Sequence, residues 1–278
     1  MSGPLRVLLA GLRAAAIAVL LFATLYPFAW MLSTAFKQNS EILVFPPRIL
    51  PTHPTLDHFR EVFLGGTVGP YFANSLAATA VSTLLTLALA TPAAFALASH
   101  RFPGDSGRHL GLGFLLLRFL PPFAIVIPLF VMMRSAGLID TVVALIVVYT
   151  AFHLPLAIWI IQPAVSQIPR EITEAAAVDM AGPLRTFWSI ILPLLRPSIA
   201  TAAAFCTIFS WNEFFFSLIL TTNKAKTFPV LVSSFVTDSG PEWGTIAATS
   251  LVAITPIVVL CVLLQRHLVG GLTSGAVR

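Results

Sequence analysis

The chain has 278 residues, of which 57% are hydrophobic and 10% carry a charged side chain. A typical soluble domain carries about 25% charged residues, so this chain has too few to cover a globule in water. The composition excludes a soluble protein and indicates one that lies in a lipid bilayer. The formal net charge is +5, and the basic residues are scattered mostly singly near the ends of apolar segments. That pattern follows membrane topology, so we expect no nucleic-acid partner.

Six apolar segments are long enough to cross a bilayer as helices, which takes about 20 mostly apolar residues. Four of them contain no Asp, Glu, Lys or Arg, whereas Arg118 lies in the third and Glu213 in the fifth. We therefore predict an all-α membrane protein with six transmembrane helices in a single domain over residues 1–278. The predicted spans are 14–33, 74–97, 110–133, 141–163, 197–220 and 244–264.

Basic residues fall unequally on the two sides that these spans define. Nine arginines lie on one side, and six Lys or Arg residues lie on the other. Because cytosolic loops are enriched in Lys and Arg, we predict that the richer side is cytoplasmic, with both termini and the polar loop 164–196. Segments 36–72 and 221–243 then face outward, where they could receive an external partner. The first is rich in proline and has one amphipathic run at 56–63, which predicts extended chain and a short surface helix.

The chain carries none of the usual signs of catalysis or nucleotide binding. It has no Gly-x-x-x-x-Gly-Lys-Ser/Thr phosphate loop, no His/Cys cluster spaced for a metal, and no recognisable set of nucleophile and base. Cys206 and Cys261 lie in apolar spans, so we expect packed thiols rather than ligands. We predict that the chain is not an enzyme and holds neither a metal nor a cofactor of its own.

The polar loop 164–196 is predicted to contain two short helices. Pro169 suits the first turn of a helix, and the helix dipole favours the negative charge of Glu171 in that turn by about 0.3 to 1 kcal/mol. The first helix is expected over 171–180, where three consecutive alanines let another protein approach the backbone closely. The Gly-Pro pair at 182–183 ends it.

A second helix is expected to run from Pro183 toward Pro193. The two helices together would form a compact knob that can sit in a cleft of another protein. Their spacing resembles the coupling loop, or EAA motif, by which permease subunits of ATP-binding cassette (ABC) importers bind their ATPase. The resembling residues are Glu174-Ala175-Ala176, Asp179 and Ile190-x-Leu192-Pro193.

Further segments extend the resemblance to nearly the whole chain. They are Phe45-Pro-Pro, 94–103, 120–128, Trp211-Asn-Glu-Phe214 and 265–277. Together they are similar to the MalG-type permease of binding-protein-dependent carbohydrate importers, which has the type I (MetI/MalG-like) permease fold. The resemblance implies a sugar permease of a bacterial plasma (inner) membrane that pairs with a second permease subunit. It also implies an extracytoplasmic solute-binding protein and two ABC ATPase subunits that bind the ATP.

Two other functions remain open. An importer of this kind could carry a non-sugar solute such as glycerol phosphate or a polyol. A self-contained secondary transporter or channel is the more remote alternative. It would usually need coupling charges in its own spans, which here hold only two, and it has no use for a coupling loop.

The resemblance also implies which residues couple the chain to its ATPase, and one of them departs from the family pattern. Met180 stands where glycine is usual. Glycine there supplies a positive φ, which methionine adopts only at a cost of roughly 1 kcal/mol or more. We expect a turn rebuilt around Gly182; the alternative is that Met180 offers an apolar side chain to the ATPase groove. The coupling residues are Glu171, Glu174, Ala175, Ala176, Asp179, Met180, Gly182, Pro183 and Pro193.

Arg118, Trp211, Asn212 and Glu213 are candidates for the translocation pathway or its gate. Charged side chains within membrane spans are costly and usually functional. One hypothesis is a gating salt bridge between Arg118 and Glu213. Another is that Asn212 and Glu213 hydrogen-bond sugar hydroxyls while Trp211 stacks on the sugar ring. The remaining alternative is a structural polar contact between spans or with the partner permease.

Overall fold

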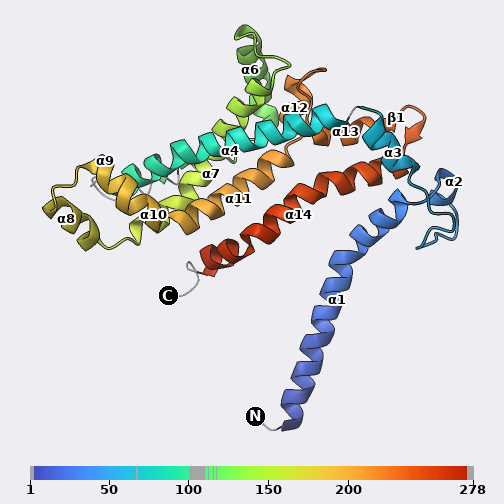
Figure 1. The fold of residues 1–278 in the computed structure, drawn as a ribbon, viewed down its shortest axis with the longest axis horizontal. Helices are drawn as coiled ribbons and strands as arrows, with labels where there is room; N and C mark the ends of the chain where they lie inside the picture. Colours follow the sequence, from blue (N-terminus) through green and yellow to red (C-terminus); the bar gives the residue numbers. More distant parts are fainter. Residues whose placement is uncertain are drawn as a thin grey trace. The chain divides into compact units, whose positions relative to one another are not determined.

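The computed structural model describes residues 3–66, 68–99, 110–111, 113–114, 116 and 118–273, which are helical along most of their length (Figure 1). The chain divides into two compact units. The first combines Met1–Gly69 with Val232–Thr255, and the second combines Pro70–Leu231 with Pro256–Arg278. The single transmembrane domain stays a prediction.

The first unit contains the N-terminal apolar helix and the folded part of segment 36–72. The short surface helix expected at 56–63 is present as α3, displaced by one residue. A two-residue hairpin pairs Val236 with Pro241 and Thr237 with Gly240. The elements are α1 (Gly3–Ala35), α2 (Asn39–Ile42), α3 (Asp57–Leu64), β1 (Val236–Thr237), β2 (Gly240–Pro241) and the start of α14 (Trp243–Thr273).

The helix α3 is held by a buried histidine that lies against a glycine. Nε2 of His58 lies 3.0 Å from the carbonyl oxygen of Lys37. A β-carbon at Gly244 would come within 2.1 Å of that same nitrogen, so only glycine allows α14 to pass this close. The Lys37 side chain is buried as well, donating from Nζ to the Arg48 carbonyl at 2.6 Å and lying 4.6 Å from the centre of the Trp30 ring.

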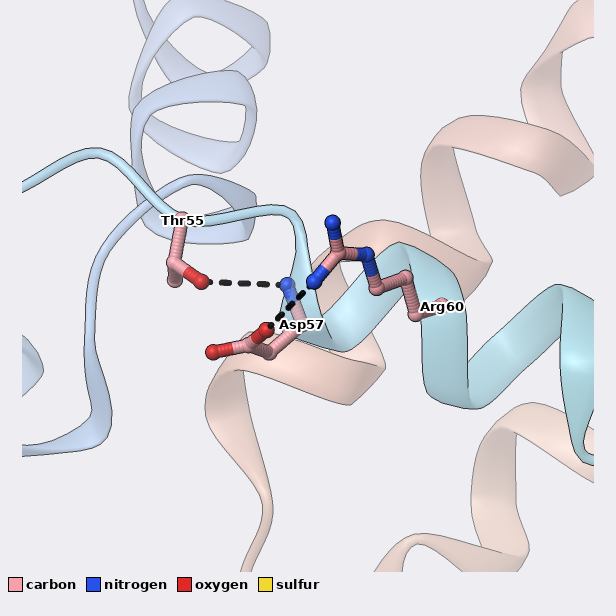
Figure 2. Close-up of polar contacts among 3 residues, drawn as sticks. All are labelled: Thr55, Asp57 and Arg60. Atoms are coloured by element: carbon pink, nitrogen blue, oxygen red, sulfur yellow. Dashed lines mark hydrogen bonds and ion pairs between the residues drawn. The ribbon is translucent and has the colours of Figure 1, made fainter.

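Polar side chains define the first turn of α3 (Figure 2). Oγ1 of Thr55 accepts a hydrogen bond from the backbone N–H of Asp57 at 3.1 Å. The Asp57 carboxylate lies 3.6 Å from Nη1 of Arg60 one turn later, and both side chains are exposed. An exposed pair of this kind contributes little to stability, so the buried His58 contact matters more for placing α3.

The second unit is a helical bundle in which α4, α7 and α11 pack side by side, with α8, α9 and α10 at one end (Figure 1). Small residues, Ala90 and Ala94 of α4 and Ala202 of α11, are fully buried and let the helices approach closely. The helices are α4 (Val68–Ser99), α6 (Pro122–Ser135), α7 (Val142–Ser166), α8 (Arg170–Val178), α9 (Pro183–Thr186), the π-helix η2 (Phe187–Ile191), α10 (Leu192–Leu194), α11 (Arg196–Trp211), α12 (Phe215–Leu220), α13 (Phe228–Ser234) and the end of α14.

Four helices among the described residues are long and apolar enough to cross a membrane. A fifth is counted if the bent pair Pro183–Leu194 and Arg196–Trp211, which meet at 73°, forms one span. The count of six therefore stays a prediction. Arg101, Arg108 and Arg278, which entered the topology prediction, lie outside the described residues, as do 100–103 and 274–277 of the resembling segments.

Two predicted spans are interrupted, which corrects the expectation of continuous helices. In the third, α6 begins only at Pro122, and Arg118 lies in a turn before it. Two adjacent prolines explain the break, because each lacks a backbone N–H and restricts the residue before it. In the fifth, α11 ends at Trp211 and α12 begins at Phe215.

Candidate functional site

The first helix of the polar loop forms as predicted, although it ends two residues earlier. Pro169 is the N-cap residue of α8 and Glu171 lies in its first turn. Glu174 and Ala175 are exposed, whereas Ala176 is 5% exposed and turned inward. The small-residue face that a partner can reach therefore excludes Ala176, which corrects the expectation that all three alanines are presented.

The helix α8 ends in a Schellman motif centred on Met180. The N–H of Ala181 donates to the Ala176 carbonyl at 2.9 Å, and the N–H of Met180 donates to the Ala177 carbonyl at 3.1 Å. Met180 itself takes the left-handed conformation, with φ 56°. Gly182 is extended instead, with φ −65° and ψ 162°. The predicted turn around Gly182 is therefore wrong: the methionine occupies the position that glycine usually fills in this motif.

The loop also presents exposed apolar side chains near this turn. Met180 is 92% exposed, Val178 is 83% exposed and Leu184 is 76% exposed. Beside them, Glu174 is one of the residues that line a cavity of about 700 Å³ between α8, η2 and the ends of α4 and α7. Exposed apolar groups gathered on one polar loop are typical of a protein interaction site.

The second part of the loop is not the single helix that we expected from Pro183 to Pro193. The chain forms α9, then η2, then α10. The N–H of Leu192 donates to the Phe187 carbonyl, five residues back, which is the π-helical pattern. Pro193 follows directly and has no N–H to offer, and a mid-helix π-turn of this kind is often functional.

The two charged residues of the predicted spans do not form a salt bridge with each other. Glu213 accepts hydrogen bonds from the backbone N–H groups of Phe216 at 2.9 Å and Ser217 at 3.2 Å. These are the free donors of the first turn of α12, so Glu213 caps that helix. The guanidinium carbon of Arg118 instead lies 4.6 Å from the centre of the Phe209 ring. The hypothesis of an Arg118–Glu213 gate is thus not met in this conformation.

Trp211 and Asn212 lie at the same break but differ in exposure. Trp211 is 4% exposed and its ring meets Phe72 edge-on, with centroids 5.4 Å apart. A sugar ring has no access to it here, which corrects the stacking hypothesis for this conformation. Asn212 is exposed, and its Nδ2 donates to the Ile208 carbonyl at 2.8 Å.

A buried polar string inside the bundle was missed by the sequence analysis. Oγ of Ser210 lies 3.2 Å from Nδ1 of His153 and 3.4 Å from Oγ of Ser82. These side chains come from α11, α7 and α4, so they join the three central helices. The signal that could have revealed the string was His153, an ionisable residue in an apolar span.

Asp140 was also missed, although it organises the loop between α12 and α13. It has φ 60°, and its carboxylate accepts hydrogen bonds at 3.0 to 3.2 Å from the backbone N–H groups of residues 222–225. Desolvation raises the pKa of Asp140, but the four backbone donors outweigh it and hold that pKa below its ordinary value. Its position just after Gly137 in a short turn was the available signal, since Asp tolerates the left-handed conformation.

The bundle and its protruding loop together define a permease chain of the kind found in ABC importers. The fold matches that of a chain in the crystal structure of a bacterial ABC transporter involved in the import of the acidic polysaccharide alginate. The TM-score is 0.78 at 21% sequence identity, covering 96% of this chain and 98% of the other. Residues 90–273 match the family described as the binding-protein-dependent transport system inner membrane component, and the chain belongs to that family.

Curated relatives match along most of their length. The diacetylchitobiose uptake system permease protein DasC of Streptomyces coelicolor is 38% identical over 264 residues, which cover 94% of each chain. The trehalose transport system permease protein SugB of Mycobacterium tuberculosis is 37% identical over 257 residues, covering 91% of this chain and 92% of the relative. The relatives are named as transport permeases, so this chain is a multi-pass membrane protein of a transport system.

Proposed function

We propose that this chain is one of two permease subunits of an importer that moves a sugar across a bacterial plasma membrane. Its energy comes from ATP hydrolysed by separate ABC ATPase subunits, and its solute from an extracytoplasmic binding protein. The relatives named for diacetylchitobiose and trehalose uptake support the choice of a sugar. In this proposal the loop 164–196 and both termini lie in the cytosol, and the chain binds no cofactor or metal.

The observation that carries the proposal is the exposed end of α8, which is firmly attached to the bundle behind it. Glu174, Ala175 and Met180 are exposed. Directly after the turn, Phe187 and Ile191 are buried in a cluster with Ala94 and Ile161 of the membrane helices. A push on α8 therefore reaches α4 and α7 through packed side chains, since close-packed interiors transmit strain.

The coupling role is tested by adding bulk to the exposed small-residue face. Ala175→Trp should block docking of the ATPase subunits while leaving the fold intact, because residue 175 is exposed and α8 tolerates a large outward side chain. We expect saccharide-stimulated ATP hydrolysis by the reconstituted complex, with its binding protein, to fall at least tenfold. Val19→Trp, on an exposed position of the apolar helix α1 and outside the loop 164–196, is the comparison for bulk alone.

A different result would reject the proposal outright. If the purified chain moved solute across proteoliposomes without any ATPase subunit, a self-contained transporter would be the correct description. A set of saccharides supplied to the full complex with its binding protein then identifies the solute, by which of them stimulates ATP hydrolysis.

A further inference from the structure

Arg118 has an unusual environment for a cation in a predicted membrane span. It lies in the turn that precedes α6, with its guanidinium carbon 4.6 Å from the centre of the Phe209 ring. Its Nη1 atom is buried and has no hydrogen-bond partner. The ring face offers attraction worth about 0.5 to 2 kcal/mol but cannot replace the hydrogen bonds that a guanidinium makes in water.

No carboxylate of the described residues balances this charge. Glu213 is the acidic residue of the predicted spans, and both of its oxygens accept backbone N–H groups of α12. Arg118 forms no ion pair with it or with any other described residue, whereas the exposed Arg60 and Asp57 do pair. Arg118 is half-buried, and taking part of a charged group out of water without a counter-charge is unfavourable, so the environment of its buried Nη1 atom is incomplete in the isolated chain.

Arg118 lies against the Phe209 ring, and its neighbours in the chain include exposed aromatic and aliphatic side chains. Phe119 is 75% exposed, Phe123 is 74% exposed, Leu116 is 66% exposed and Phe209 is 41% exposed. An arginine set among exposed aromatic side chains is the composition that carries most of the energy in protein interfaces. A sugar site needs several convergent hydrogen-bonding groups, which these neighbours lack. Lipid chains would cover the apolar side chains but would leave the charge unpaired.

We infer that Leu116, Arg118, Phe119, Phe123 and Phe209 form a docking surface for the second permease subunit, which brings an Asp or Glu carboxylate to Arg118. The inference rests on the proposed function, since it needs a second membrane-spanning chain. Arg118 presents a planar fork of donors to the partner carboxylate, a geometry that lysine copies only in charge.

Contact is tested directly in the purified complex of both permeases and the ATPase, with Arg118 left intact. Replacing Phe119 by the photo-crosslinking residue p-benzoylphenylalanine should give an adduct with the second permease on irradiation. An adduct with lipid alone, or with no protein, overturns the inference. The same replacement at Phe45, which is 92% exposed in the first outer segment, is the control and should not give that adduct.

The charge is tested by Arg118→Gln, with Arg118→Lys to keep the charge and Arg134→Gln as the matched exposed control at the end of α6. We expect Arg118→Gln to lower recovery of the second permease in the complex at least tenfold, Arg118→Lys to restore part of it, and Arg134→Gln to change nothing. Thermal unfolding of each isolated chain in detergent separates weak assembly from misfolding.

Two outcomes overturn the charge pairing. If Arg118→Gln assembles normally but loses saccharide-stimulated ATP hydrolysis, Arg118 contacts the solute instead. If neither assembly nor activity changes, the charge has no partner at all. The proposed function itself fails in a different way, when the wild-type complex shows no saccharide-stimulated hydrolysis whatever stands at residue 118.

Discussion

Met180 shows how one residue type can change the chemistry of a surface without changing the backbone. Its left-handed φ of 56° closes the α8 turn as a glycine would. A methionine tolerates that conformation at a cost of roughly 1 kcal/mol or more. Contacts of the Met180 side chain within the chain do not offset this cost, because the side chain is 92% exposed. We therefore interpret the exposed thioether as a group that the ATPase subunit buries.

This interpretation predicts how substitutions at residue 180 change binding of the ATPase subunits. Met180→Gly and Met180→Asn both suit a left-handed position and both remove the apolar side chain, so each should weaken binding of the ATPase subunits about tenfold or more. Met180→Leu keeps the apolar side chain and should bind nearly as the wild type does. Affinity measured between the permease complex and the isolated ATPase decides. Tighter binding by the glycine variant would mean that backbone strain, not the side chain, governs the contact.

Asp140 makes a second prediction at the scale of a residue. Asp140→Asn keeps the shape of the side chain but replaces an acceptor by a donor facing four backbone N–H groups. Because hydrogen bonds to a charged group contribute about 1.5 to 3 kcal/mol, we expect a lower midpoint of thermal unfolding in detergent and faster amide exchange at 222–225. Asp238→Asn, on an exposed position of the hairpin, should leave both measurements unchanged.

The depressed pKa of Asp140 also fixes the direction of a pH effect. The stabilisation is fully present above the ordinary aspartate pKa of about 3.9 and is lost as the pH falls from there toward the lower folded-state pKa. The wild type should therefore lose its stability advantage over Asp140→Asn progressively below about pH 4. An advantage that stayed constant down to strongly acidic pH would show that the carboxylate charge is not what holds the loop.

At the scale of an element, the break between α11 and α12 gives Glu213 a structural role. Glu213→Leu removes both acceptors from the first turn of α12, and loss of a cap costs about 0.5 to 2 kcal/mol. Glu213→Gln keeps one carbonyl oxygen and should be intermediate. We expect less folded protein in both variants but normal saccharide-stimulated ATP hydrolysis per assembled complex. A complex that assembles fully and hydrolyses no ATP on stimulation would instead restore the gate hypothesis.

Some of these element boundaries were within reach of the sequence. The adjacent Pro121 and Pro122 indicate that a new helix begins there. The span prediction missed this boundary because it counted apolar residues and took no account of the prolines. Pro169, Glu171 and the Gly-Pro pair located the first loop helix to within two residues and the start of the second, but not the end of the second. The residues Phe187 and Ile191 of the π-helix η2 pack against α4 and α7, which no local sequence pattern predicts.

At the scale of the whole molecule, composition decided most of the fold class. A chain that lies in lipid has to satisfy its backbone polar groups internally, and apolar segments of about 20 residues do so as helices. Composition and spacing did not predict which residues far apart in the sequence lie in contact. His153 and Ser210 are 57 residues apart, and Asp140 lies more than 80 residues from the N–H groups that it binds. Apolarity and spacing locate helices, whereas polar partners across helices follow only from the packed bundle.

The Asp140 loop also bears on which sequence changes the chain can accept. Every donor to that carboxylate is a main-chain N–H, and Asn74 in turn donates to the carbonyl oxygens of Lys224 and Lys226. Substitutions of Thr222, Asn223 and Lys224 should therefore be tolerated, except by proline, because proline has no N–H. Insertions and deletions are another matter, since one extra residue would move the whole row of amides out of register. Among related chains, the residue types in this loop should vary while its length stays the same.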